Sequence, residues 1–525
     1  MNIFTIFAFI ICSFNLIYTL SVNLGIIHSQ DVDPLNPTVL KRVDRYYMRQ
    51  GKSPQVDFIE TIVTDILSAN STLCELTAEG IIGLIGPTYQ TLAPILQSIC
   101  ANLEIPYVEY TWKPSGEPQN MTINFFPESN LMAKGFAALV ASMNWKSFTV
   151  LYETTESLAK LRDVLKINVP RELPMIFKQI HPDEDYRVVF KQIKNYTENT
   201  IIIDCELDRV IPILQQAKEV GMLEYHNKYF LANLDAHTLD FSDLSTTANI
   251  TTISLLNTTL PILRHATKDW SDGRKSRIKP EEVKVEQAIL HDAAYFFMRR
   301  YYELRVVDRE VGFTPESLLC DKKNILQHGF RMYHYMLSKS EELGESLTAP
   351  IRFDASGRRI DFNLYGVEII EGKKEVIVDW NPSMGDEVNF RRNFTQQLQA
   401  AVENLRKVKV IVAARLGAPY VLKKTSENGD NATVEGFAYD LIKEIADDMN
   451  FTFEFKLYDE YGKYNPATKT WNGLIKALLD RSAHLAICDL TITEARRSVV
   501  DFTLPFMNLD ICRRQHLASK TQRCR

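Results

Sequence analysis

Within the first 380 residues, stretches with the apolar pattern of a strand alternate with stretches whose apolar residues have the spacing of a helix. Ile81–Ile85 is a short continuous apolar run, which is typical of a strand buried on both faces of a parallel sheet. Gly86–Thr88 then breaks the run with a turn signal, and Leu92–Leu103 places its apolar residues at helical spacing. Ile105–Val108 is strand-like again. This order predicts right-handed strand–helix–strand units in a parallel sheet covered by helices.

The same order repeats further along the chain. Leu131–Met143 has helical spacing, Phe148–Tyr152 and Ile201–Asp204 are strand-like, and Leu207–Val220 is helical again. Two sheets fit this number of units better than one, and we therefore expect two lobes. The cleft between two such lobes is the default place for a ligand or for domain movement.

The pattern changes near residue 380. Asp379–Asp386 is rich in turn residues, and a new apolar strand is predicted at Val408–Ala413. A helix with one apolar face begins at Phe437, and we expect it to stop at Asn450. Phe451–Leu457 then alternates as a strand with one buried face. The pattern predicts a second α/β domain.

The first residues indicate export. Ile3–Leu20 is almost wholly apolar and carries no charge, and Thr19 and Ser21 offer small residues for cleavage. Residues 1–21 are therefore predicted to be a secretory signal peptide. The alternative is an uncleaved membrane anchor, because a run of this length nearly spans a bilayer. Asn15 interrupts the run and favours the signal peptide.

Composition excludes several classes of protein. The 525 residues allow three or four folding units at roughly 100–200 residues each, and 45% hydrophobic with 24% charged residues is ordinary for a soluble globular chain. The net charge of −6 argues against nucleic-acid binding, which needs a basic surface. The common catalytic, phosphate-binding and metal-binding motifs do not occur. We therefore expect no enzyme activity, no cofactor and no metal site.

Eight Asn-x-Ser/Thr sequons agree with export, because such sites are glycosylated in secreted proteins. They are spread over the whole chain, at Asn70, Asn120, Asn195, Asn249, Asn257, Asn393, Asn431 and Asn450.

Four separated stretches together resemble the ionotropic glutamate receptors. They are Gly417–Val421, Glu435–Leu441, Trp471–Gly473 and His484–Met507. The AMPA and kainate branch is the nearest match, and Asp489 is similar to the residue in arthropod subunits of that branch.

The resemblance extends upstream and implies a domain layout. Gly83–Pro87 and Gln97–Leu103 look like the amino-terminal domain of kainate-type subunits. The family then implies an α/β chain with a two-lobed, periplasmic-binding-protein-like amino-terminal domain, followed by the first half of a second α/β clamshell that binds the ligand. We expect these at 22–390 and 408–511, with a linker over 391–407 and an aberrant basic tail over 512–525. The family's pore helices and second clamshell segment do not follow in this sequence.

The resemblance also implies a site for glutamate or a related amino acid. Arginine can hold an α-carboxylate through two parallel charged hydrogen bonds, and the family places this arginine in Thr-Ile-Thr-x-x-Arg, which ends at Arg496 here. The adjacent Arg497 is acidic in many relatives and does not inherit the role. Thr491 matches the residue that assists both the carboxylate and the amine of the ligand.

Two more positions follow from the same resemblance. Tyr461 matches the tyrosine that packs over the ligand, with Tyr458 and Tyr464 as alternatives in register. Asp489 stands where vertebrate relatives have proline, and both its carbonyl and its carboxylate are available to the ligand's ammonium. Gly417 replaces an acidic residue common in that strand, which weakens the expectation of a contact across the cleft there.

The eight cysteines divide into classes. Signal removal leaves seven, so at least one cannot pair within a monomer. The resemblance implies a disulfide between Cys74 and Cys320, which suits an oxidising compartment. Cys100 lies on an apolar helix and Cys205 at a strand end, and we expect both to be buried free thiols.

Three functions are considered for this chain. The first is a subunit of a kainate-type, ligand-gated cation channel of the plasma or postsynaptic membrane, in a form without pore and second ligand-binding segment. The alternative is a secreted, non-channel isoform that modulates assembly or acts as a decoy, binding full-length subunits through its amino-terminal domain. An enzyme-linked receptor ectodomain is the third, and the motifs in 408–511 disfavour it. Because the opposing lobe is missing, we expect this chain alone to bind glutamate weakly or not at all.

Overall fold

The computed structural model describes residues 21–503 apart from internal gaps. The gaps are 29–32, 34, 50–54, 87–91, 113–119, 146, 168–175, 183, 197, 225–226, 273, 275–276, 308–316, 319–323, 340–345, 371, 392–402, 404–405, 407, 425–432 and 469. Residues 1–20 and the predicted tail therefore lie outside the described residues, as do Cys320, Asn393 and Asn431. Within the described ranges, none of the helices combines the length and the apolar run that a bilayer crossing requires.

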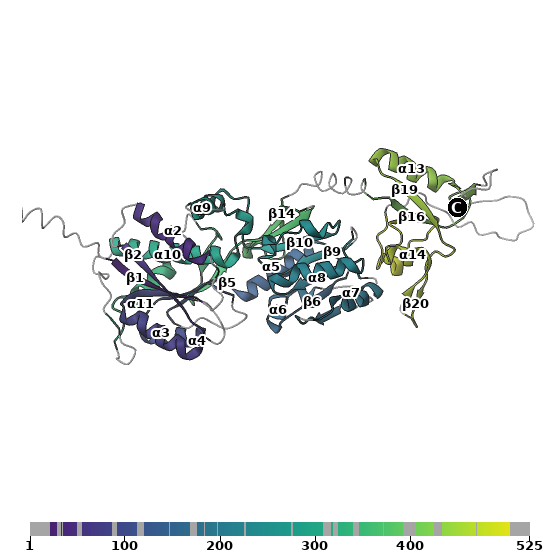
Figure 1. Cartoon of the computed structure of the whole chain (residues 1–525). Coiled ribbons are helices and arrows are strands. Elements are labelled where there is room, and N and C mark those ends of the chain that lie inside the picture. The colour runs from purple at the N-terminus through teal and green to yellow at the C-terminus, as the bar shows by residue number, and fades with distance from the viewer. Residues whose placement is uncertain are drawn as a thin grey trace, which may run out of the picture. The chain divides into compact units, whose positions relative to one another are not determined.

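The chain divides into two compact units between residues 392 and 393. The first unit holds two sheets (Figure 1). Within the described residues, its first sheet has seven strands, all parallel except for the pair at one edge. Their order is β11 (Arg352–Phe353), β12 (Arg358–Asp361), β5 (Thr122–Pro127), β4 (Tyr107–Glu109), β3 (Ile81–Gly86), β1 (Ser21–His28) and β2 (Gln55–Ile62).

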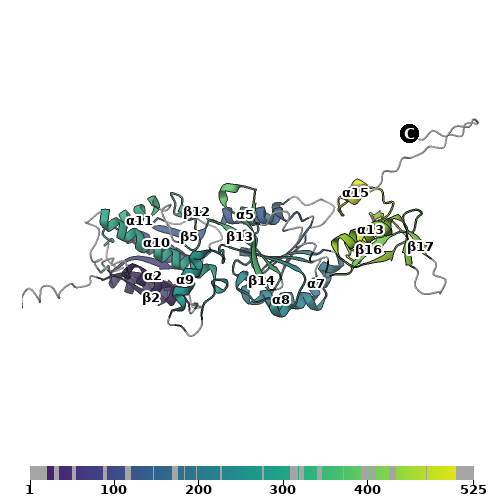
Figure 2. The same ribbon diagram turned by 90° about the horizontal axis from the view of Figure 1, so that it is seen from above.

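Helices cover both faces of this sheet because its strands bury alternate residues on opposite sides. In β1, Ile26 joins one buried cluster with side chains of α2 and α10, whereas the next residue, Ile27, joins another cluster with α3 and α4. The views from the side and from above both show α2 and α10 along the sheet (Figures 1 and 2). The helices of this lobe are α2 (Asn36–Arg49), α3 (Ile66–Ala78), α4 (Ala93–Asn102), α9 (Pro261–Ser271), α10 (Val285–Val307) and α11 (Gly329–Ser338).

The second sheet forms the second lobe. The part of this lobe that the structure describes has eight strands, in the order β15 (Asn389–Phe390), β14 (Lys373–Trp380), β13 (Leu364–Ile370), β10 (Asn249–Ser254), β9 (Lys228–Leu231), β8 (Thr200–Asp204), β6 (Thr149–Tyr152) and β7 (Ile176–Gln179). The strands from β10 to β7 are parallel, and β13, β14 and β15 are antiparallel additions. Its helices are α5 (Ser129–Ser142), α6 (Thr155–Lys160), α7 (Tyr186–Asn195) and α8 (Leu207–Glu219).

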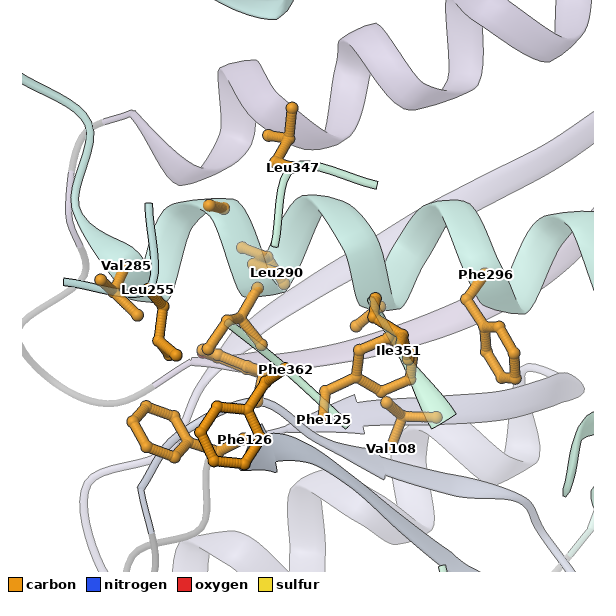
Figure 3. Close-up of a cluster of buried hydrophobic side chains, with 14 of the residues drawn as sticks. Val108, Phe125, Phe126, Leu255, Val285, Leu290, Phe296, Leu347, Ile351 and Phe362 are labelled. Carbon is orange, nitrogen blue, oxygen red and sulfur yellow. The ribbon is translucent and has the colours of Figure 1, made fainter. Parts of the chain in front are cut away.

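One hydrophobic cluster continues from the first lobe into the second. It contains Val22 and Val108 of the first sheet together with Val150 and Phe230 of the second. Figure 3 shows its aromatic centre, where Phe125 of β5 lies 5.2 Å from the ring of Phe296 on α10. The two lobes therefore share part of their core.

The second unit is built on a small parallel sheet. The order is β19 (Phe453–Leu457), β16 (Val410–Ala414) and β22 (Leu485–Ala486), so the first strand in sequence lies in the middle. Two antiparallel pairs accompany it: β17 (Leu422–Lys424) with β18 (Thr433–Glu435), and β20 (Tyr464–Asn465) with β21 (Thr470–Trp471). The helices are α13 (Phe437–Met449), α14 (Gly473–Leu479) and α15 (Glu494–Arg497).

The predicted α/β architecture is confirmed, including the helix stop at Asn450. That residue ends α13 in the left-handed conformation, which asparagine tolerates better than most side chains. Cys100 and Cys205 are buried free thiols, as expected. Burial raises the pKa of Cys205 to about 12, so this thiol stays protonated and unreactive at neutral pH.

Candidate functional site

The candidate ligand residues of the second unit gather where its parallel strands end. The carboxyl ends of β16, β19 and β22 meet at one edge of the sheet, beside the central first strand. Ligands in open α/β sheets bind at such a point, where the strand order reverses. Arg415 follows β16 directly, Tyr461 follows β19, and Asp489 follows β22.

The loop that carries Tyr461 is held by the start of α14. Leu474 donates its amide to the carbonyl of Glu460 at 3.0 Å, and Ile475 donates to that of Tyr461 at 3.3 Å. Two glycines allow this close packing. A Cβ on Gly473 would lie 2.1 Å from the Glu460 carbonyl oxygen, and one on Gly462, whose φ is +122°, would lie 2.5 Å from Ile475 Cγ1. The site therefore depends on glycine at both positions.

Arg496 is oriented by backbone carbonyls. It lies in α15, whose first turn is capped by the hydroxyl of Thr493. Its Nε and Nη2 donate to the carbonyl oxygen of Gly462 at 3.3 and 3.0 Å, and its Nη1 donates to that of Thr491 at 2.7 Å. A guanidinium has five N–H groups, so one on each terminal nitrogen remains for another acceptor. This pair matches a carboxylate.

Tyr461 lies between a cation and a carboxylate. The Arg415 guanidinium stacks 4.4 Å from the centre of the Tyr461 ring, and its Nη1 donates to the Tyr461 hydroxyl at 2.7 Å. That hydroxyl donates in turn to Asp489 Oδ1 at 2.8 Å. Burial and the hydrogen bond to Asp489 raise the pKa of Tyr461, so the hydroxyl keeps its proton at neutral pH. The ring orientation is thereby fixed from both sides.

The structure brings Tyr461, Asp489 and Arg496 to one edge, with Thr491 present through its carbonyl. The two alternatives to Tyr461 lie elsewhere. The hydroxyl of Tyr458 lies 3.2 Å from Ser482 Oγ, and the ring of Tyr464 packs on that of Trp471 at 5.5 Å.

Arg415 was not among the sequence-derived site residues. Its sequence signal is weak, because it is one arginine at the end of an apolar strand. Its hydrogen bond to Tyr461, which lies 46 residues later in the chain, places it in the site.

The remaining predicted sites belong to other surfaces. Cys74 is disulfide-bonded, while its expected partner Cys320 lies outside the described residues, so the pairing stays a prediction. Of the described sequons, five expose their asparagine: Asn70, Asn120, Asn195, Asn249 and Asn450. Asn257 is buried, with its Nδ2 inaccessible and its Oδ1 accepting from the amide of Thr259 at 3.0 Å. The folded chain therefore offers no room for a glycan at that position.

Comparison with known proteins finds related sequences for both units. Residues 54–371 match the receptor family ligand binding region, and residues 408–514 match the ligated ion channel L-glutamate- and glycine-binding site. The mouse glutamate receptor ionotropic, kainate 1, is 29% identical over 457 residues, which are 85% of this chain and 54% of that protein. The human protein of the same name is 28% identical over 472 residues, 85% of this chain and 51% of its own length. The chain thus spans about half the length of these curated relatives. It belongs to the ionotropic glutamate receptor family, and its relatives include kainate-type subunits.

Proposed function

We propose that this chain contributes one lobe of an amino-acid site in a kainate-type, ligand-gated channel subunit. The observation that carries the proposal is Arg496, whose guanidinium is fixed by the carbonyls of Gly462 and Thr491 and keeps two N–H groups for a carboxylate. The matched glutamate- and glycine-binding region supports the same ligand class.

The other side chains suit the rest of an α-amino acid. Asp489 is exposed, and only its Oδ1 takes part in the contact with Tyr461, so Oδ2 can accept from the ligand's ammonium. The Tyr461 ring, held by Arg415, offers an apolar surface to the carbon chain between the charged groups. A zwitterion therefore matches the site better than a simple anion.

The affinity of this lobe alone should be low. Asp489 is exposed and Arg496 half-buried, and an ion pair open to water contributes about 0–1 kcal/mol. Micromolar binding needs about 8 kcal/mol, so tight binding requires an opposing lobe that excludes water. We expect calorimetry on the full chain to show no saturable glutamate binding below millimolar concentrations.

Saturation-transfer NMR with millimolar glutamate tests the site on the full chain. The unmodified chain should transfer saturation to glutamate, and Arg496→Ala should abolish the transfer. Arg497→Ala is the matched control, because Arg497 is the exposed neighbour on the same short helix and should leave the signal unchanged. Equal transfer in the unmodified chain and Arg496→Ala would refute the site. A micromolar dissociation constant that Arg496→Ala abolishes would support the site and refute the low affinity.

We further propose that the first unit associates with like subunits outside the cell. The first 21 residues and the exposed sequons support the location. Leu67 at the start of α3 is 84% exposed and Ile62 at the end of β2 is 57% exposed, so both side chains are accessible to a partner surface. Sedimentation of the full chain should show self-association that Leu67→Lys weakens. A strict monomer at micromolar concentrations that also fails to bind related subunits would refute this proposal and the secreted assembly modulator alike.

A further inference from the structure

The ligand edge of the second unit holds a second guanidinium besides that of Arg496. Arg415 is half-buried directly after β16. Its Nε donates to the carbonyl oxygen of Asp459 at 2.9 Å, and its Nη1 donates to the hydroxyl of Tyr461 at 2.7 Å. A guanidinium has five N–H groups, so one on Nη1 and both on Nη2 remain for another acceptor. Donors on two neighbouring nitrogens match a carboxylate.

The positive charge of Arg415 is not used within the second unit. In the part of the chain that the structure describes, its partners are the carbonyl of Asp459 and the hydroxyl and ring of Tyr461, and none of these is a carboxylate. The carboxylate of Asp489 accepts from the Tyr461 hydroxyl instead. Arg415 can therefore form a charged hydrogen bond with a carboxylate that a ligand supplies.

Arg415 and Arg496 are held by the same short loop. Arg415 donates to the carbonyl of Asp459, and Arg496 donates to that of Gly462 at 3.0 and 3.3 Å. These carbonyls belong to residues three positions apart, which limits their separation to about 10 Å. Tyr461 lies between them in the loop, with the Arg415 guanidinium 4.4 Å from its ring centre. One loop thus keeps both cations at the ligand edge.

The surroundings of Cys488 agree with this arrangement. Cys488 immediately precedes Asp489 and is a buried free thiol. Burial and the Asp489 carboxylate raise its pKa to about 12, whereas the guanidinium groups of Arg496 and Arg415 both act to lower it. Charges shift a pKa in this way only when they are close. Asp489 and both cations therefore lie around the same residue.

A dicarboxylic amino acid has one charged group for each of these side chains. Its α-carboxylate matches Arg496, its ammonium matches Asp489, and its distal carboxylate matches Arg415. The site has one more cation than carboxylate, and such a ligand has one more carboxylate than ammonium. A neutral amino acid would leave Arg415 without an anionic partner.

We propose that Arg415 is a specificity-determining residue, through which this lobe prefers amino acids with a second carboxylate to neutral amino acids of the same size. The inference rests on the proposed amino-acid site at Arg496. It adds a preference that Arg496 and Asp489 do not provide, because these two side chains match groups that all α-amino acids share.

Saturation-transfer titrations of the full chain with glutamate and with glutamine test this preference. Glutamine has the same length as glutamate and lacks the distal charge, so the ratio of the two dissociation constants reports on that group. We expect glutamine to bind about 2- to 5-fold more weakly, the range for an ion pair open to water. Arg415→Met should remove the preference, and Arg415→Lys, which keeps the charge, should retain part of it.

The ratio separates recognition of the ligand from a structural role of Arg415. Loss of the contacts that hold Tyr461 would weaken both ligands by the same factor and leave the ratio unchanged. Lys409→Met is the matched control, because Lys409 precedes β16 at its other end and its ammonium lies 2.7 Å from Glu454 Oε2. It removes the same charge from the unit and should keep the preference.

Arg415→Gln tests the proposal where Arg415→Met fails to fold, because glutamine keeps an N–H donor for the Tyr461 hydroxyl and also removes the charge. Equal binding of glutamate and glutamine to the unmodified chain would overturn the inference, and so would a preference that persists in both variants. The amino-acid site itself would still stand if Arg496→Ala abolished the transfer to both ligands. Transfer to neither ligand in the unmodified chain would overturn both proposals.

Discussion

The substitution Gly462→Ala should loosen the ligand edge of the second unit. Its φ of +122° is a backbone conformation that side chains with a Cβ rarely adopt, which costs roughly 1–3 kcal/mol. The new Cβ would also lie 2.5 Å from Cγ1 and 2.7 Å from Cβ of Ile475, which is fully buried on α14 and has no room to withdraw. Overpacking of this kind costs about 1–3 kcal/mol more. The sum is roughly 2–6 kcal/mol.

Hydrogen exchange measured by mass spectrometry reports this loss of stability at the loop that contains Gly462. The amides of Leu474 and Ile475 donate to the loop that contains Gly462, so their exchange follows the opening of this loop. A loss of 2 kcal/mol or more should accelerate their exchange about 30-fold or more, since each 1.4 kcal/mol is a factor of ten. Because the Gly462 carbonyl orients Arg496, glutamate saturation transfer should fall as well.

Gly417→Ala is the matched control. It lies in the same unit, a Cβ there would meet nothing within 4 Å, and its φ is not in the positive range. Its effect should stay within about 0.5 kcal/mol. Equal exchange rates in Gly462→Ala and Gly417→Ala would refute the argument from φ and packing.

Three more outcomes are expected. Non-reducing peptide mapping should join Cys74 to Cys320, and a free thiol at both would disprove the pairing. Burial and the nearby carboxylate of Asp235 raise the pKa of Glu286 from 4.5 to about 7, so the folded chain holds a proton that the unfolded chain has lost between these pH values. Stability should therefore fall as pH rises through this window, and Glu286→Gln should flatten the dependence of the melting temperature on pH. Asn450→Val should destabilise α13 by about 1–2 kcal/mol in thermal melts, while Asn450→Gly should be nearly neutral, because the position is left-handed.

The sequence predicts the central elements well because their pattern comes from local burial. The helix expected at Leu207–Val220 is α8, Leu207–Glu219, and the strand expected at Ile81–Ile85 is β3, Ile81–Gly86. The buried residues of such a strand or helix follow a regular spacing, and this spacing is visible in the sequence of the element itself. The antiparallel strands β13 to β15 were not predicted, because their place at the end of the second sheet depends on pairing with a strand more than 100 residues earlier.

The candidate site likewise contains residues that the sequence predicts and residues that it does not. Arg496, Thr491 and Asp489 lie within one continuous motif, so a resemblance can identify them from sequence. The roles of Arg415 and Gly462 come from contacts between loops that follow different strands. Such roles depend on tertiary geometry, which the local pattern around a single arginine or glycine does not contain.

The hydrophobic cluster shared by the two lobes of the first unit has a consequence for how this unit unfolds. A side chain such as Phe230 of the second sheet belongs to the same packed cluster as Val22 of the first. Neither lobe can lose its own part of the cluster without exposing apolar surface on the other. The first unit should therefore melt as one cooperative block in calorimetry, with two lobes but a single transition.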